Sequence, residues 1–380
     1  MKTLAQVEPR TPISALPTNI TGPGSYYLTT NLTGAALATG ITVLADHVTI
    51  DLSGFAIIGA GQVGGTAHAI AVPGPQVDLK VLNGSITLWS GEGVFAPLAV
   101  NSKLEDLRVS TVGRTGLDIG DGSEIRDSVV QSNCSYAVGA SYGIQAGNHC
   151  AIRSCVAQGN SGPGIKTGQN ALVTGCVANN NTDKGIFTGD NSLASACEAS
   201  VNTGANPGDG IFVGYGSSVS GCVACGNAHD GIETINGGSV LGCTVWSNQT
   251  DGILVQYGSM VKDCTACANG RDGIGVTLRC QAVGNTCDAN LHNGLMAYTG
   301  YNRIDGNSFT SNHWSAVDCS ASSYDLVVRN NAALNGHAND WNMNNSGIPY
   351  SQCAEILQPG INFIVNDPWA NFELGSGPAH

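Results

Sequence analysis

The sequence predicts an all-β solenoid, in which a single chain winds into stacked parallel coils of ~21 residues. Three observations predict this fold class. Small residues, asparagines and cysteines recur at one common period, short runs alternate between apolar and polar residues, and Gly, Asn and Asp separate these runs. Alternation with period two indicates strands with one buried face, and Gly and Asn supply the left-handed backbone that turns require. Helical spacing of apolar residues is absent.

The repeat consists of three columns of residues that keep one register. The first is a small residue followed by an aliphatic one: Gly143-Ile144, Gly164-Ile165, Gly185-Ile186, Gly210-Ile211, Gly231-Ile232, Gly252-Ile253, Gly273-Ile274, Gly294-Leu295 and Ala316-Val317. The second is asparagine: Asn133, Asn160, Asn181, Asn202, Asn227, Asn248, Asn269, Asn290 and Asn312. The third is cysteine: Cys155, Cys176, Cys197, Cys222, Cys243 and Cys264. Most steps are 21 residues, and each column contains the same irregular step of 25, so the register is shared.

One coil, residues 219–234, illustrates the predicted packing. Its alternation directs five side chains inward, where like residues of successive coils stack: Val219, Cys222, Ala224, Ile232 and Thr234. We expect each asparagine of the second column to bond the turn of a neighbouring coil and so satisfy buried backbone groups. The cysteines of the third column are expected to be buried free thiols that act as small apolar fillers.

The asparagine column and the repeated Asn-x-x-x-Gly-Ile signature, as in Asn227 to Ile232, resemble the right-handed parallel β-helix proteins of the pectate-lyase-like superfamily. The resemblance covers roughly residues 40 to 330 and implies about 12–13 right-handed coils, capped at both ends. The segments 23–28 and 366–372 resemble the flanks of secreted bacterial members. Most enzymes of this superfamily cleave or remodel polysaccharides, by β-elimination or hydrolysis. However, its Gly-His-Gly and Arg-x-Pro-x-x-Arg catalytic signatures are missing, so no catalytic residue is carried over.

The repeat predicts three parts of the chain: an N-terminal arm and cap at 1–40, the β-helix at 41–317, and a C-terminal cap and tail at 318–380. The sequence as given does not open with a signal-peptide pattern, so we expect either a removed leader or an intracellular protein. The resemblance favours a secreted or cell-surface protein. No apolar run is long enough to predict membrane insertion.

The charge of the chain excludes one class of partner. It carries 15 Lys and Arg against 28 Asp and Glu, a formal net charge of -13. Such a surface repels a phosphate backbone, so nucleic-acid binding is not expected.

Departures from the repeat predict where a ligand binds. Extra residues after Asn133 and after Asn202 fall at the same turn, before the Gly-Ile strand, and we expect them to wall a groove over that strand. The outward residue one place after each aliphatic is Gln145, Lys166, Phe187, Phe212, Glu233, Leu254, Gly275, Met296 or Asp318. Aromatic side chains beside a few charges suit a polysaccharide or oligosaccharide. The predicted substrate-binding residues are Phe187, Phe212, Tyr215, His229, Tyr257 and Arg271. Equally, Phe187, Phe212, Leu254 and Met296 form an apolar stripe that would suit a homo-oligomer.

An acidic column, Asp209, Asp230, Asp251 and Asp272, precedes four of the glycines. Carboxylates stacked ~4.8 Å apart can share a calcium ion or divide acid and base roles. The alternative interpretation is ordinary turn chemistry of Asp before Gly. The predicted catalytic residues are Lys166, Asp183, Lys184, Asp230 and Glu233. In a lyase, Lys166 or Lys184 would be the base, and Asp183 with Asp209 would hold Ca²⁺.

Three functions remain open from the sequence. The first is a polysaccharide lyase or hydrolase that works in the groove. The second is a non-catalytic glycan-binding or cell-surface protein, and the third is an oligomeric structural rod.

Overall fold

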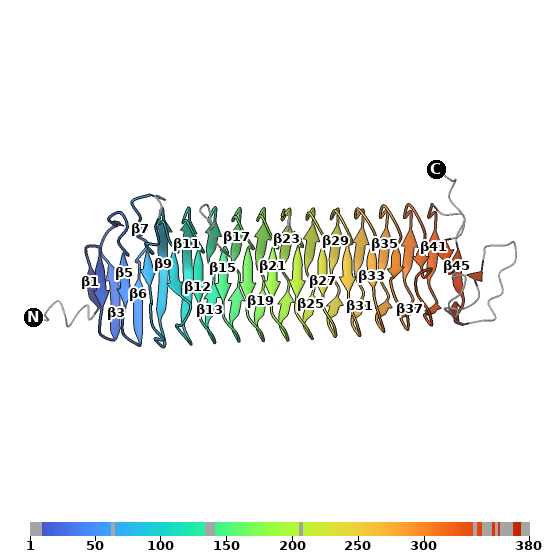
Figure 1. The fold of residues 1–380 in the computed structure, drawn as a ribbon, viewed down its shortest axis with the longest axis horizontal. Helices are drawn as coiled ribbons and strands as arrows, with labels where there is room; N and C mark the ends of the chain where they lie inside the picture. The colour runs from blue at the N-terminus through green and yellow to red at the C-terminus, as the bar shows by residue number, and fades with distance from the viewer. Residues whose placement is uncertain are drawn as a thin grey trace, which may run out of the picture. The chain divides into compact units, whose positions relative to one another are not determined.

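The structure is a computed structural model that describes residues 10–61, 65–133, 141–204, 208–336, 340–343, 352–353, 356–357 and 368–373. The chain divides into two compact units, Met1–Thr188 (unit 1) and Gly189–His380 (unit 2). Within the described ranges, every regular element is a β-strand, and the strands of successive coils lie side by side in each unit (Figure 1).

Unit 1 is built from parallel strands in two sheets. Its sheet B strands, which carry the Gly-Ile positions, are β2 (Thr18–Ile20), β5 (Ile41–Val43), β8 (Ile70–Ala71), β10 (Val94–Ala96), β12 (Leu117–Ile119), β15 (Ile144–Ala146), β18 (Ile165–Thr167) and β21 (Ile186–Thr188). Its sheet A strands are β1 (Thr11–Ile13), β3 (Gly24–Leu28), β4 (Leu32–Thr33), β6 (Val48–Asp51), β7 (Ala56–Ile58), β9 (Lys80–Thr87), β11 (Lys103–Ser110), β13 (Glu124–Arg126), β14 (Val129–Gln131), β16 (Ala151–Arg153), β17 (Val156–Gln158), β19 (Leu172–Thr174) and β20 (Val177–Asn179).

Unit 2 repeats the same arrangement. Its sheet B strands are β24 (Ile211–Val213), β27 (Ile232–Thr234), β30 (Ile253–Val255), β33 (Ile274–Val276), β36 (Leu295–Ala297), β39 (Val317–Asp318) and β42 (Trp341–Asn342). Its sheet A strands are β22 (Leu193–Ser195), β23 (Glu198–Ser200), β25 (Ser218–Ser220), β26 (Val223–Cys225), β28 (Ser239–Leu241), β29 (Thr244–Trp246), β31 (Met260–Lys262), β32 (Thr265–Cys267), β34 (Gln281–Val283), β35 (Thr286–Asp288), β37 (Arg303–Asp305), β38 (Ser308–Thr310), β40 (Leu326–Val328), β41 (Asn331–Ala333), β43 (Gln352–Cys353), β44 (Ile356–Leu357) and β45 (Asn371–Glu373).

The predicted fold class, a parallel β-helix, is confirmed. Strand β27 lies between β24 and β30 in parallel, with Ile211, Ile232 and Ile253 in register. All five side chains predicted to point inward in this coil are buried: Val219, Cys222, Ala224, Ile232 and Thr234. The isoleucines of these coils therefore stack on one another, and the inward side chains form the core of the coils.

The asparagine column forms the predicted ladder. The Oδ1 atom of Asn248 accepts bonds from the backbone N–H of Asn227, at 3.1 Å, and from its side-chain amide, at 2.9 Å. The amide of Asn248 donates to the carbonyl of Ala224, at 3.1 Å. A buried turn that lacks strand partners is thereby satisfied by side chains of the same column.

The cysteine column is buried and consists of free thiols, as predicted. Each thiol also contacts backbone oxygen; for example, the Sγ atom of Cys222 donates to Ala194 O at 3.6 Å. Cys225 and Cys267, which alternation places on the outer face, are half-buried.

The predicted insertions beside the groove lie largely outside the described residues. These are the first insertion, around Cys134 to Gly139, and half of the second, Ala205 and Asn206 of Thr203 to Asn206. The walls of the groove and the boundaries at residues 40 and 317 therefore stay predictions. Across the described ranges, no helix has the length and apolarity needed to span a bilayer.

Candidate functional site

The acidic column of unit 2 is a second ladder. The backbone N–H of Asp230 lies 3.4 Å from Oδ1 of Asp209, that of Asp251 lies 2.9 Å from Oδ1 of Asp230, and that of Asp272 lies 3.1 Å from Oδ1 of Asp251. All four carboxylates are buried. These hydrogen bonds join successive coils. The acids therefore bond to backbone N–H groups, as the alternative interpretation of Asp before Gly expects, but the bonds run between coils and not within one turn.

The residue before each later acid bonds to the acid of the previous coil. His229 Nδ1 lies 2.5 Å from Asp209 Oδ1, and the Thr250 hydroxyl donates to Asp230 Oδ1. Arg271 donates to both oxygens of Asp251, with Nε at 2.7 Å from Oδ1. Asp209 and Asp251 thus bond to a basic side chain of the next coil. Asp230 bonds instead to the hydroxyl of Thr250.

The pKa values of two acids of this column, Asp230 and Asp272, are raised. Burial, followed by the negative charge of Asp251, raises the pKa of Asp230 to about 6, against the hydrogen bond from Thr250. Burial and Asp251 also raise the pKa of Asp272, against hydrogen bonds from Asn293. A stack of like charges in a low-dielectric site favours protonation of some members, which is the behaviour expected here.

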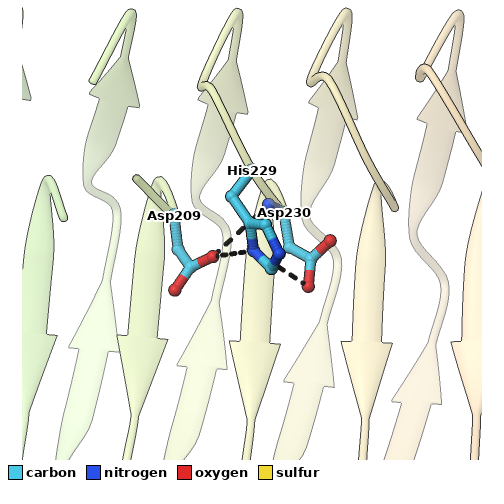
Figure 2. A group of neighbouring side chains, drawn as sticks. All are labelled: Asp209, His229 and Asp230. Carbon is cyan, nitrogen blue, oxygen red and sulfur yellow. Dashed lines mark hydrogen bonds and ion pairs between the residues drawn. The ribbon is translucent and has the colours of Figure 1, made fainter. Parts of the chain in front are cut away.

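Figure 2 shows the first members of this column as a compact group: His229 lies between Asp209 and Asp230. His229 Nδ1 is 3.5 Å from Asp230 Oδ2, and one donor atom from each residue lies within 4.8 Å of the others. The two carboxylates are buried, whereas 37% of the His229 side chain is exposed. Two carboxylate oxygens and one imidazole nitrogen are atoms that can coordinate a cation.

Further along unit 2, Tyr298 crosses the outer face of β33. Its hydroxyl donates to Asp251 Oδ2 at 3.3 Å and to Asp272 Oδ2 at 3.2 Å. The ring occupies the space that a side chain at Gly275 would fill, since a Cβ there would lie 2.9 Å from Tyr298 Cε2. Gly275 pairs in register with Leu254 and Met296 of the predicted outward column, and it is buried.

The remaining predicted residues of unit 2 are dispersed over its surface. Phe212 and Glu233 are register partners on the outer face of β24 and β27, and both are half-buried. Glu233 accepts a hydrogen bond from Gln256 Nε2 at 3.0 Å. Tyr215 and Tyr257 are exposed.

In unit 1, Lys166 and Phe187 are register partners on β18 and β21. Lys166 Nζ donates to Tyr142 Oη at 2.9 Å and lies 5.6 Å from the centre of the Phe187 ring. Asp183 uses Oδ1 to accept the backbone N–H of Lys184, at 2.7 Å, which is local turn chemistry. The predicted calcium pair, Asp183 and Asp209, belongs to different units and stays a prediction.

The structure brings an unpredicted acid into the outer row of sheet B in unit 1. Asp118 pairs in register with Phe95 on one side and with Gln145 on the other. It occupies the position one place after Leu117, just as Lys166 follows Ile165. Extending the outward column to the irregular N-terminal coils would have found both Phe95 and Asp118.

Asp118 lies within electrostatic reach of Glu92, which in turn contacts His68. Only 7% of Asp118 and 8% of Glu92 are exposed. His68 Nδ1 is 2.6 Å from Glu92 Oε2, and the His68 ring stacks on Phe95 with centroids 4.6 Å apart. Burial, then the charge of Glu92, raises the pKa of Asp118 to about 7, and its Oδ1 makes no hydrogen bond to the described residues. This acid therefore exchanges its proton near neutral pH.

Comparison with known families identifies the architecture. Residues 93–242 match a family model described as "Right handed beta helix region". Together with the parallel coils of both units, the match shows that the chain is a right-handed parallel β-helix. No curated protein matches the chain.

Three solved structures match the chain at low sequence identity. The mannuronan C-5 epimerase AlgE6 A-module of Azotobacter vinelandii is 16% identical, with a TM-score of 0.45, over 94% of this chain and 91% of that one. The periplasmic alginate epimerase AlgG is 12% identical, with a TM-score of 0.37, over 93% and 78%. The Agl-KA catalytic domain is 13% identical, with a TM-score of 0.42, over 84% and 61%.

Proposed function

We propose that the protein is a polysaccharide-cleaving enzyme whose acid–base chemistry takes place at Asp118 and Glu92, on the outer face of sheet B in unit 1. The observation that carries the proposal is a buried acid, Asp118, under the electrostatic influence of a second buried acid, Glu92. Asp118 keeps its proton up to about pH 7 because of burial and the charge of Glu92. Glu92 instead lies 2.6 Å from the imidazole of His68.

Glycoside hydrolysis needs one carboxyl group that donates a proton and a second that acts as base or nucleophile. Asp118 would protonate the leaving oxygen of the glycosidic bond. Glu92 would act as the base or the nucleophile, and His68 would hold it in place. If Glu92 is the nucleophile, Asp118 regains its proton from the water that hydrolyses the glycosyl intermediate. If Glu92 is the base, it takes the proton of the attacking water and releases it to solvent, and Asp118 is reprotonated from solvent.

The residues beside this pair suit a sugar chain. Sheet B places Phe95, Asp118, Gln145, Lys166 and Phe187 one above the other, at ~4.8 Å per coil. The aromatic rings at the two ends offer apolar faces to sugar rings, and Gln145 offers an amide to hydroxyls. Lys166 supplies a cation that would pair with a uronate carboxyl group.

The contact between Lys166 and Tyr142 favours a second candidate, β-elimination on a uronate. In that reaction Lys166 would neutralise the substrate carboxyl group, and the Tyr142 hydroxyl, 2.9 Å from Lys166 Nζ, would serve in proton transfer. Both candidates use the same face of unit 1, and they differ in product. Hydrolysis yields only new reducing ends, whereas elimination also yields unsaturated ends that absorb ultraviolet light.

The proposal is tested by incubating the full chain with neutral and uronate polysaccharides and measuring both products. We expect Asp118→Asn and Glu92→Gln each to lower kcat/KM by about 10²-fold or more, because each removes a proton-transfer group. Lys166→Met should raise KM for uronate substrates only. Glu124→Gln, which removes a carboxylate from sheet A, is the matched control and should leave activity unchanged.

Two results would contradict enzymatic function at this face. The first is full activity in both Asp118→Asn and Glu92→Gln. The second is saturable glycan binding with no product from any substrate, which would indicate a glycan-binding protein instead.

A further inference from the structure

The group formed by Asp209, His229 and Asp230 in unit 2 has a feature that the ladder does not explain. Asp230 Oδ1 already accepts bonds from the Thr250 hydroxyl and from the backbone N–H of Asp251. Asp230 Oδ2 is also buried, yet it makes no hydrogen bond to any described residue. Burial of a carboxylate oxygen that accepts no hydrogen bond is unfavourable. The hydrogen bonds of the described residues therefore leave this oxygen unsatisfied.

This oxygen faces the other two donors of the group. Its nearest basic atom is His229 Nδ1, at 3.5 Å, and that nitrogen is 2.5 Å from Asp209 Oδ1 (Figure 2). The three atoms converge from two successive coils, so their relative positions are fixed by the solenoid. A cation placed among them would satisfy Asp230 Oδ2 and replace the hydrogen bond between His229 Nδ1 and Asp209 Oδ1, while the bonds from backbone N–H groups to the stacked acids remain.

We propose that Asp209 Oδ1, His229 Nδ1 and Asp230 Oδ2 bind one first-row divalent cation, with water completing the coordination. Two carboxylates and one imidazole suit Mn²⁺, Fe²⁺ or Zn²⁺, whereas calcium sites are built from oxygen ligands alone. The partly exposed His229 side chain leaves the site open to water. The inference does not depend on the proposed polysaccharide chemistry, which uses residues of unit 1.

Hydrogen bonds from neighbouring residues orient the two carboxylate ligands, Asp209 and Asp230. The Asp251 N–H and the Thr250 hydroxyl fix Asp230 through Oδ1, and the backbone N–H of Asp230 lies 3.4 Å from Asp209 Oδ1. Such supporting bonds orient ligands and raise affinity. Ligand atoms around a metal at ~2.1 Å lie ~3 Å apart, so His229 needs to move by about half an ångström. Any proton on Nδ1 leaves to solvent when the metal binds.

The test is a Mn²⁺ titration of the full chain after chelation, at physiological salt, followed by electron paramagnetic resonance of the free ion. Mn²⁺ prefers carboxylate over thiolate ligands, so the cysteines do not compete. We expect one saturable site per chain. Asp230→Asn keeps an acceptor for the Asp251 N–H but removes the free carboxylate oxygen, and it should weaken binding at least tenfold. Asp272→Asn is the matched control and should bind like the wild type.

His229→Ala supplies a second variant, because its side chain is partly exposed and its loss leaves the ladder intact. It should also weaken Mn²⁺ binding at least tenfold, with an unchanged circular dichroism spectrum. Saturable binding should also raise Tm, since a ligand that binds only the folded state stabilises it. Loss of affinity in Asp272→Asn equal to that in Asp230→Asn, or no saturable site in the wild type, would overturn the proposal.

Discussion

The backbone N–H of Asp251 donates to Oδ1 of Asp230, 2.9 Å away and one coil earlier. The asparagine ladder runs the opposite way, because the backbone N–H of Asn227 donates to Oδ1 of Asn248, one coil later. The two ladders flank the same turn, between β26 and β27. This turn is therefore tied to the coil before it through Asp209 and to the coil after it through Asn248.

The asparagine ladder should be among the least replaceable features of unit 2. Asn248→Ala leaves the buried N–H of Asn227 and the carbonyl of Ala224 without their partners. We expect a loss of about 3 kcal/mol in the free energy of unfolding, since each buried unsatisfied group costs about 1–3 kcal/mol. Urea unfolding followed by circular dichroism measures the change. The neighbouring exposed Gln249→Ala should change stability by less than about 0.5 kcal/mol, and equal effects in both variants would contradict this account.

The glycine of the Gly-Ile signature should be required for space and not for backbone conformation. A Cβ on Gly231 would lie 2.6 Å from the amide nitrogen of Asn248 and 2.6 Å from the carbonyl oxygen of Gly252. We therefore expect Gly231→Ala to lower stability by about 1–3 kcal/mol through overpacking. Gly22→Ala, where no atom lies within 4 Å of the added carbon, is the control. Unchanged urea midpoints in both variants would argue against the steric explanation.

The sequence predicted the register of the coils because the columns recur without a gap from Gly143 onward. The 21-residue period also places His229 and Arg271 one residue before the positions stacked on Asp209 and Asp251, so these pairs, 20 residues apart, are expected to be neighbours. The repeat could not predict the hydrogen bond from Tyr298 to Asp251. This bond depends on a long side chain that lies over Gly275, where no side chain blocks it.

Asp118 is not predicted, for a different reason. The coils before Gly143 have unequal lengths, so the strand position at Leu117 is looser and the residue after it stands out less as an outward position. Burial of the acid, which gives it its chemistry, depends on residues of three coils and has no local signal. The position of a side chain in a solenoid is thus easier to predict than its environment.

The ladder cysteines should be protected from alkylation in the folded protein. Cys222 and Cys243 are buried, whereas Cys225 and Cys267 are half-buried on the outer face. We expect iodoacetamide to label Cys225 and Cys267 slowly, because burial raises the pKa of both thiols and lowers the thiolate fraction. Peptide mapping by mass spectrometry would show which sites react. Labelling of Cys222 or Cys243 at the same rate, in the absence of denaturant, would contradict the buried ladder.

The pH dependence of unit 1 should follow Asp118. Its pKa is raised to about 7 in the folded protein, against ~3.9 in an unfolded chain, so folding takes up a proton between these values. Stability from this group is fully present below about pH 4 and is lost as the pH rises through about 7. Between pH 5 and pH 8 the wild type should therefore lose about 2–3 kcal/mol that Asp118→Asn does not lose. Urea titrations of both proteins at the two pH values measure the difference, and Glu124→Gln should behave like the wild type. If cleavage uses Asp118 as an acid, activity should fall over the same range, as the proton is lost. Parallel stability profiles for the wild type and Asp118→Asn would show that this carboxyl group is ionised throughout and would remove it as the acid.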